Sequence, residues 1–132
     1  NQFYRSLLAD KAHGVFQGKV HVYQEAQQTD GYQLSNAIML SDGAEMDTKP
    51  ELEIYADDVQ CSHGATTGQL EDEPLFYMRA RGISEKDAKR LLMQSFLAEV
   101  SEHVRDDDTR ADIDAAIDEW LSDNLQTTEV TT

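Results

Sequence analysis

The chain has 132 residues, with 26 acidic and 11 basic side chains and a net charge of −15. Because phosphate-rich partners need a basic surface, we expect neither nucleic acids nor anionic membranes as partners. The length suits about one domain, and no apolar run approaches the roughly 18 residues of a membrane span. A single cysteine excludes an intramolecular disulfide and fits a reducing compartment, so a cytoplasmic location is expected.

Up to about residue 66, apolar residues recur at every second position, which is the period of half-buried strands. Three strands are predicted, centred on Val20, Ile38 and Ile54, with turn signals at residues 30–31 and 41–43. The predicted inward faces are Phe16, Gly18, Val20 and Val22, then Leu34, Ile38 and Leu40, and then Leu52, Ile54 and Ala56. Repeated long strands without intervening helices are typical of a sandwich, a barrel or a β-solenoid, and the spacing does not choose among these.

After residue 70 the period becomes helical. Pro74 suits the first turn of a helix that ends at Gly82, which is expected at the C′ position. A second helix is expected to begin after Ser84, which forms a capping box with Asp87, and to run to about Val104. Its predicted apolar stripe consists of Ala88, Leu91, Leu92, Phe96 and Val100.

A third helix is predicted after a charged break at residues 105–108, with Thr109 and Asp112 as its cap. One side of this helix is apolar and carries Ile113, Ala116, Ile117, Trp120 and Leu121. The predicted fold class is therefore an all-β core with C-terminal helices, α+β by segregation. The expected domain organisation is a strand domain over 1–70, a helical domain over 71–123 and a disordered tail over 124–132.

Four segments carry a specific pattern: residues 30–37 (DGYQLSNA), 47–59 (DTKPELEIYADDV), 61–66 (CSHGAT) and 75–83 (LFYMRARGI). In this order they resemble the SufB/SufD family of the SUF iron–sulfur cluster assembly system. One segment alone would be a weak signal, whereas the ordered set is very specific. In the SufB branch two glutamates flank the matching histidine. Here Ser62 and Gly64 flank His63, which makes the chain more similar to the SufD branch.

The resemblance implies a right-handed β-helix end followed by a three-helix segment, in a scaffold subunit that is not an enzyme. It also implies a complex in which the chain pairs with SufB and docks the SufC ATPase. The region expected to meet SufC comprises Leu75, Phe76, Arg79, Arg81, Gly82 and Ile83. No cofactor is expected in the chain alone, and a transient iron–sulfur cluster is expected in the full complex. By itself the chain is expected to form a dimer, because an uncovered β-helix coil is a template for another copy.

Cys61 and His63 are the candidate ligands. Two residues apart on a strand, they lie on one face, and a thiolate and an imidazole both bind iron, zinc or a cluster fragment. Two ligands do not close a tetrahedral site, and the resemblance implies that SufB shares it. If the strand has no bulge, both residues share the parity of Glu53 and Tyr55 and point away from the core. Two alternatives stay open: a small metal- or thiol-dependent enzyme that uses the same pair, and a β-helix binding module with another ligand.

Overall fold

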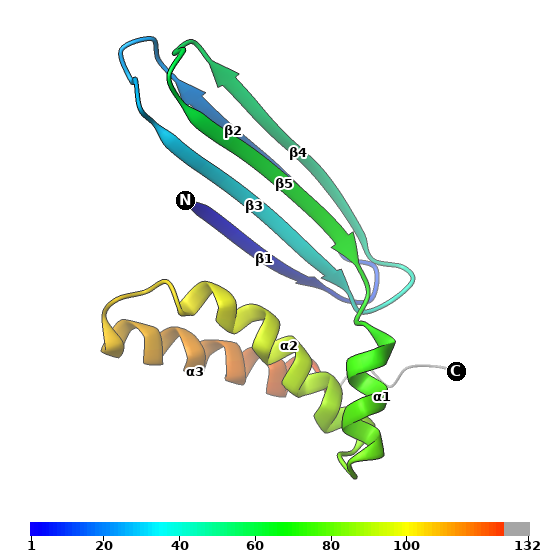
Figure 1. Cartoon of the computed structure of the whole chain (residues 1–132). Coiled ribbons are helices and arrows are strands. Elements are labelled where there is room, and N and C mark those ends of the chain that lie inside the picture. Colours follow the sequence, from blue (N-terminus) through cyan, green and yellow to red (C-terminus); the bar gives the residue numbers. More distant parts are fainter. Residues whose placement is uncertain (126–132) are drawn as a thin grey trace. The chain divides into compact units, whose positions relative to one another are not determined.

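The computed structural model describes residues 1–125 of the chain. Strands come first and helices follow, so the fold is α+β with the two kinds of element segregated along the chain (Figure 1). The strands are β1 (Gln2–Leu8), β2 (His13–Val22), β3 (Asp30–Met39), β4 (Glu45–Ile54) and β5 (Gln60–Gly68). The helices are α1 (Asp72–Ala80), α2 (Glu85–Ser101) and α3 (Asp107–Asn124). The chain divides after Gly68 into a strand unit and a helical unit.

Consecutive strands alternate between two parallel sheets. One sheet has the order β1-β3-β5, and the other consists of β2 and β4. Each strand pairs in parallel with the strand two elements earlier: Gln2 lies beside Gln33, His13 beside Glu45 and Asp30 beside Gln60. Each full pass through both sheets therefore takes 30 to 32 residues.

The sequence prediction missed β1. This strand carries apolar residues on both faces, Phe3 and Leu7 on one and Tyr4 and Leu8 on the other, so the period of two is hidden. The rings of Tyr4 and Phe16 pack with their centroids 4.7 Å apart, which places Tyr4 on the face of β1 that meets β2. β1 thus adds inward-facing side chains, of which Leu8 is buried and Tyr4 is 42% exposed.

Hydrogen bonds between successive turns extend the parallel pairing beyond the strands. Ser41 Oγ donates to the carbonyl oxygen of Asp10 at 2.8 Å, and the amide of Gln28 donates to the carbonyl oxygen of Asp58 at 2.6 Å. Gly43 approaches Asp10 so closely that an added Cβ would lie 2.7 Å from the Asp10 carbonyl oxygen. The corners are therefore stacked on one another, as the strands are.

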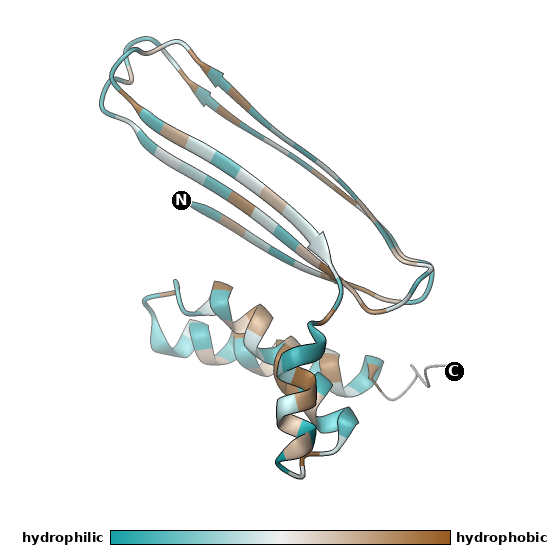
Figure 2. Ribbon diagram, turned by 45° about the vertical axis from the view of Figure 1, so that its right-hand side comes forward, coloured by the Kyte–Doolittle hydropathy of each residue, from teal (hydrophilic) through white to brown (hydrophobic). Residues whose placement is uncertain are grey.

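The inward face of β2 is the predicted one. Its alternate residues are half-buried or buried, and they are Gly14, Phe16, Gly18, Val20 and Val22. The residues between them are exposed, and the bands along the strands in Figure 2 show this kind of alternation. A strand with one face toward a core and one toward water follows from this pattern.

The inward face of β3 is the opposite of the predicted one. The most buried residues of β3 are polar or small: Gln33 and Ser35, each 1% exposed, and Ala37, 3% exposed. The predicted residues Leu34, Ile38 and Leu40 are only half-buried. β3 is the central strand of its sheet, so its inner face is covered whatever its polarity. The more apolar face of β3 is therefore not its buried face.

The predicted face of β4 is only partly inside. Leu52 is half-buried and Ala56 is 8% exposed, as the period suggested, whereas Ile54 is 39% exposed. Ile54 is the last residue of β4, and β4 pairs with β2 alone among the described residues. A side chain at the end of an edge strand has few neighbours to cover it, which explains the difference.

Capping chemistry sets the end of α1 and the start of α2 as predicted, whereas α2 ends at Ser101 and not near Val104. Gly82 follows α1 with a φ of 88°, and the next amide donates to the carbonyl oxygen of Met78 at 3.2 Å, which completes a Schellman motif. Ser84 is the N-cap of α2, and its Oγ accepts a hydrogen bond from the Asp87 amide at 3.1 Å. These short-range bonds satisfy helix-end groups that would otherwise have no partner.

The start of α3 and the packing of the helical unit differ from the prediction. Asp106, and not Thr109, is the N-cap of α3 and accepts a hydrogen bond from the Thr109 amide at 2.8 Å. The buried apolar residues of α2 and α3 are Ala88, Met93 and Leu121. Leu91 and Trp120, which were expected to pack inside, are 44% and 41% exposed. The predicted stripe therefore missed Met93, around which the buried face of α2 is centred.

Asn124, where the predicted tail begins, is the last residue of α3, and positions from 126 on lie outside the described residues. Within residues 1–125 the structure has no helix that is both long enough and apolar enough to cross a bilayer.

Replacing Ser35 with alanine should raise the free energy of unfolding by about 1 kcal/mol. The reason is that the buried Ser35 hydroxyl has no hydrogen-bond partner among the described residues. Ala37→Ser, two positions along the same face, should instead lower that free energy by about 1–2 kcal/mol. Urea unfolding of both variants measures the two effects. Destabilisation by Ser35→Ala would contradict the assignment of an unbonded hydroxyl.

Candidate functional site

Cys61 and His63 lie on β5, an edge strand of the three-stranded sheet. β5 pairs with β3, where Cys61 lies beside Gly31 and His63 beside Gln33. Through β3, the row that holds His63 continues to Gln2 on β1. Parallel register therefore places each candidate ligand in a row of side chains that crosses the sheet.

Both side chains belong to the inner face of the sheet, contrary to the prediction that they point away from the core. A Cβ on Gly31 would lie 3.3 Å from Cys61 Sγ and 3.7 Å from Cγ1 of Val20, which faces inward from β2. The parity count failed because residues 55–59 form a corner and do not continue β4. Alternation holds only while the chain keeps strand geometry, so it cannot be counted through a corner.

The two residues nevertheless remain accessible. His63 is exposed and Cys61 is half-buried. The three-stranded sheet faces a sheet of only two strands, and β5 pairs along one edge only within residues 1–125. The inward-facing side chains Cys61 and His63 of β5 are therefore accessible, whereas most of those of β3 are buried. His63 is thus more accessible than Leu52 and Ala56 of the predicted apolar face, whereas Ile54 of that face is itself exposed and Cys61 is only half-buried.

The pair offers ligand chemistry without a complete site. A thiolate and an imidazole suit iron or an iron–sulfur cluster fragment, and four donors surround each metal in such sites. Among the described residues, no group of three or more His, Cys, Asp or Glu side chains is arranged to hold a metal ion. This part of the chain can therefore supply at most some of the ligands that a cluster needs.

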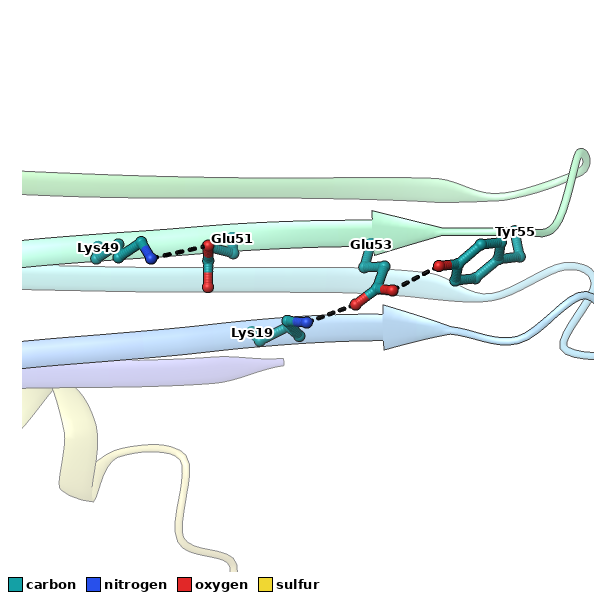
Figure 3. A network of polar contacts seen from close by, with 5 residues as sticks. All are labelled: Lys19, Lys49, Glu51, Glu53 and Tyr55. Carbon is teal, nitrogen blue, oxygen red and sulfur yellow. Dashed lines mark hydrogen bonds and ion pairs between the residues drawn. The ribbon is translucent and has the colours of Figure 1, made fainter.

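A second polar cluster, which the sequence analysis missed, lies on the outer face of the β2–β4 sheet (Figure 3). Lys19 Nζ lies 2.5 Å from one carboxylate oxygen of Glu53, and the Tyr55 hydroxyl donates to the other oxygen at 2.5 Å. Lys49 and Glu51 form a further pair at 3.2 Å. Hydrogen bonds from Lys19 and then Tyr55 lower the pKa of Glu53 to about 2. The alternating charges of Lys49, Glu51 and Glu53 on β4, beside the outward-facing Lys19 of β2, were the available sequence signal.

The segment expected to meet a partner lies in α1 and the turn after it. Phe76 is 75% exposed and Tyr77 is 57% exposed. The guanidinium carbon of Arg81 lies 4.8 Å from the centre of the Tyr77 ring. Leu75 and Ile83 are half-buried and contribute less to the surface. The exposed part of this segment thus combines aromatic rings with an arginine, a composition that is enriched in protein interfaces.

These features define a protein of stacked parallel strands, with a cysteine and a histidine on the last strand and a helical unit after it. Residues 1–96 match the family described as SUF system FeS cluster assembly, SufBD core domain. The chain belongs to this family. The matched residues include the whole strand unit and α1, and they contain both Cys61 and His63.

Similar proteins place the chain with the SufD type. The iron–sulfur cluster assembly protein SufD of Escherichia coli strain K12 is 44% identical over 120 residues, which cover 91% of this chain and 28% of that protein. A SufBD family protein of Synechocystis is 45% identical, covering 79% of this chain and 23% of its own length. SufD of Plasmodium falciparum is 37% identical, with 83% and 8% covered. The chain thus spans less than a third of the length of these relatives.

The low pKa of Glu53 predicts how the β2–β4 cross-link responds to acid. Because the folded-state pKa is about 2, below the ordinary value of 4.5, the link contributes fully above pH 4.5. Its contribution is lost as the pH falls toward 2. An NMR titration of the Glu53 carboxyl carbon should therefore have its midpoint near 2, and Lys19→Met should move that midpoint upward. Lys49→Met, which removes the neighbouring cation, should leave it in place. A Glu53 midpoint in the ordinary range would contradict the cross-link.

Proposed function

We propose that this chain forms part of a scaffold subunit for iron–sulfur cluster assembly, in which Cys61 and His63 contribute to a nascent-cluster site shared with SufB. The observation that carries the proposal is that a thiol and an imidazole on the inner face of β5 are accessible. By themselves these two side chains do not form a complete ligand set. The family match, which covers this strand, supports the same role. Parallel strands that alternate between two sheets support the right-handed β-helix that the resemblance implies.

Pairing with SufB would complete both the sheet and the ligand set. The outer edge of β5 has no strand partner among residues 1–125, and an edge of this kind can accept a strand from another chain. A chain docked there would bring its own side chains to the row that holds His63. The unpaired edges also support the dimer expected for this chain in the absence of SufB.

For SufC we propose a contact at α1. Phe76 and Tyr77 are the most exposed aromatic residues of the helical unit, and Arg81 lies over the Tyr77 ring. Exposed aromatic side chains beside an arginine are typical of residues that dominate binding energy in interfaces. The proposed SufC surface is therefore narrower than the region expected from the sequence, and Phe76 is its centre.

No observation favours an enzyme built on Cys61 and His63. An active site usually gathers convergent titratable groups in a pocket. A cavity of about 100 Å³ lies within the helical unit and is lined by Lys86, Asp87, Arg90, Leu121, Ser122 and Leu125. This cavity contains neither Cys61 nor His63 and gives no support to an enzyme built on that pair.

In the complex reconstituted with SufB and SufC, His63→Gln and Cys61→Ser should each lower the bound iron and sulfide by roughly tenfold. The melting temperature should change by less than about 3 °C, because neither side chain fills the buried core. Iron and sulfide analysis beside thermal unfolding measures both quantities. His13→Gln is the matched control, since His13 is exposed on β2 and pairs with Asp47 at 2.9 Å. Normal loading in both variants would remove the basis of the proposal.

Phe76→Ala should weaken binding of the full protein to SufC by roughly tenfold, the typical loss on truncating an exposed aromatic anchor. Titration calorimetry with purified SufC measures the dissociation constant. Leu91→Ala is the control, because Leu91 is 44% exposed on α2 and lies outside the proposed surface. Equal affinities of wild type and Phe76→Ala would show that SufC binds elsewhere.

A further inference from the structure

A row of three polar side chains crosses the inner face of the three-stranded sheet. Gln2, Gln33 and His63 lie in register on β1, β3 and β5. Gln33, the central member, is 1% exposed, whereas both outer members are exposed. Neighbouring strands are about 4.8 Å apart, so adjacent members of a row lie within reach of one another.

The Gln33 amide is satisfied on one side only. Its Nε2 donates to Gln2 Oε1 at 2.7 Å. Its Oε1 is buried and has no hydrogen-bond partner among the described residues. Buried acceptors in native proteins nearly always have a partner, and one that lacks it is unfavourable. The position of Oε1 therefore points to a donor that reaches it.

The surroundings of the amide direct Oε1 along the row. Because Nε2 is held toward β1, the oxygen on the other side of the amide is directed away from β1, and the sheet order places β5 there. The amide also lies directly against Gly18, where a Cβ would be 2.5 Å from Oε1 and 2.7 Å from Nε2. Glycine at position 18 therefore provides the space that the amide occupies. His63 is the next member of the row on the side of Oε1.

We propose that the His63 ring turns to donate a hydrogen bond to Gln33 Oε1, which makes Gln33 a positioning residue for His63. This inference rests on the cluster role proposed for the histidine. Oε1 can accept but cannot donate, so it pairs only with a ring nitrogen that carries a proton. The other ring nitrogen then keeps its lone pair, which is the form in which imidazole binds iron. Gln2 holds the Gln33 amide in turn, so the row fixes both the tautomer and the orientation of the ring.

The tautomer ratio of His63 tests this role without any cluster. It is measured from the imidazole nitrogen shifts of 15N-histidine-labelled protein at alkaline pH, with His63→Gln used for assignment. Gln33→Met keeps a long unbranched side chain and removes the acceptor. We expect the ratio of the two neutral tautomers to change by roughly three- to tenfold in this variant, the effect of one hydrogen bond.

Gly18→Ala provides a second test that leaves Gln33 in place, because the new Cβ must displace the amide. Gly18→Ala should change the tautomer ratio in the same direction as Gln33→Met. If Gln33→Met does not fold, the ratio in Gly18→Ala alone tests the positioning role of Gln33. Val15→Ala is the control on the same strand, since Val15 is 64% exposed on the outer face, and it should keep the wild-type ratio.

The outcomes separate this inference from the proposed function. Equal tautomer ratios in wild type and in the folded Gln33 or Gly18 variant would overturn the positioning role, whatever the iron content of the complex. A changed ratio supports it. If the ratio changes while His63→Gln still loads iron and sulfide normally, the positioning of the ring stands and the cluster role of His63 fails.

Discussion

Parallel pairing between successive passes of the chain is the constraint on which the rest of the structure depends. Each strand from β3 onward is placed by hydrogen bonds to the strand two elements earlier, 30 to 32 residues back. Side chains in register then form rows across the sheet, and a shift of one residue would turn a whole strand to the other face. Hydrogen bonds between the corners, such as the one from Ser41 Oγ to the Asp10 carbonyl oxygen, stack each corner on the corner one pass earlier. Register alone therefore brings Gln2, Gln33 and His63 into one row.

The interior produced by this register is partly polar. Leu8, Ala37 and Ala44 form an apolar cluster, while Gln33 and Ser35 are buried on the same inner face of β3. A buried polar group is unfavourable when it lacks a partner, and it fixes orientation when it has one. Such an interior suits the proposed scaffold role, because the polar row leads to the strand edge where His63 lies. Stability and site geometry thus depend on the same side chains.

Features that depend on neighbours in the sequence could be predicted, and features that depend on the assembled sheets could not. The alternation of β2 and the cap at Ser84 involve residues a few positions apart. The inner face of β3 is decided by its register with β1 and β5, which hydrophobicity does not reveal. The orientation of Cys61 and His63 depends on the corner at residues 55–59. Their proposed ligand role follows from residue type, whereas Gln33 carries no signal until register places it beside His63.

Direct contact between His63 and a nascent cluster is tested most sharply by pulsed EPR of the reduced cluster on the complex with SufB and SufC. The complex is prepared twice, once with natural-abundance histidine and once with 15N-histidine in this chain alone. A ligand imidazole should give a nitrogen hyperfine coupling that changes with the isotope and disappears in His63→Gln. A cluster spectrum that is identical for both isotopes would contradict the proposed role of this histidine in a site shared with SufB.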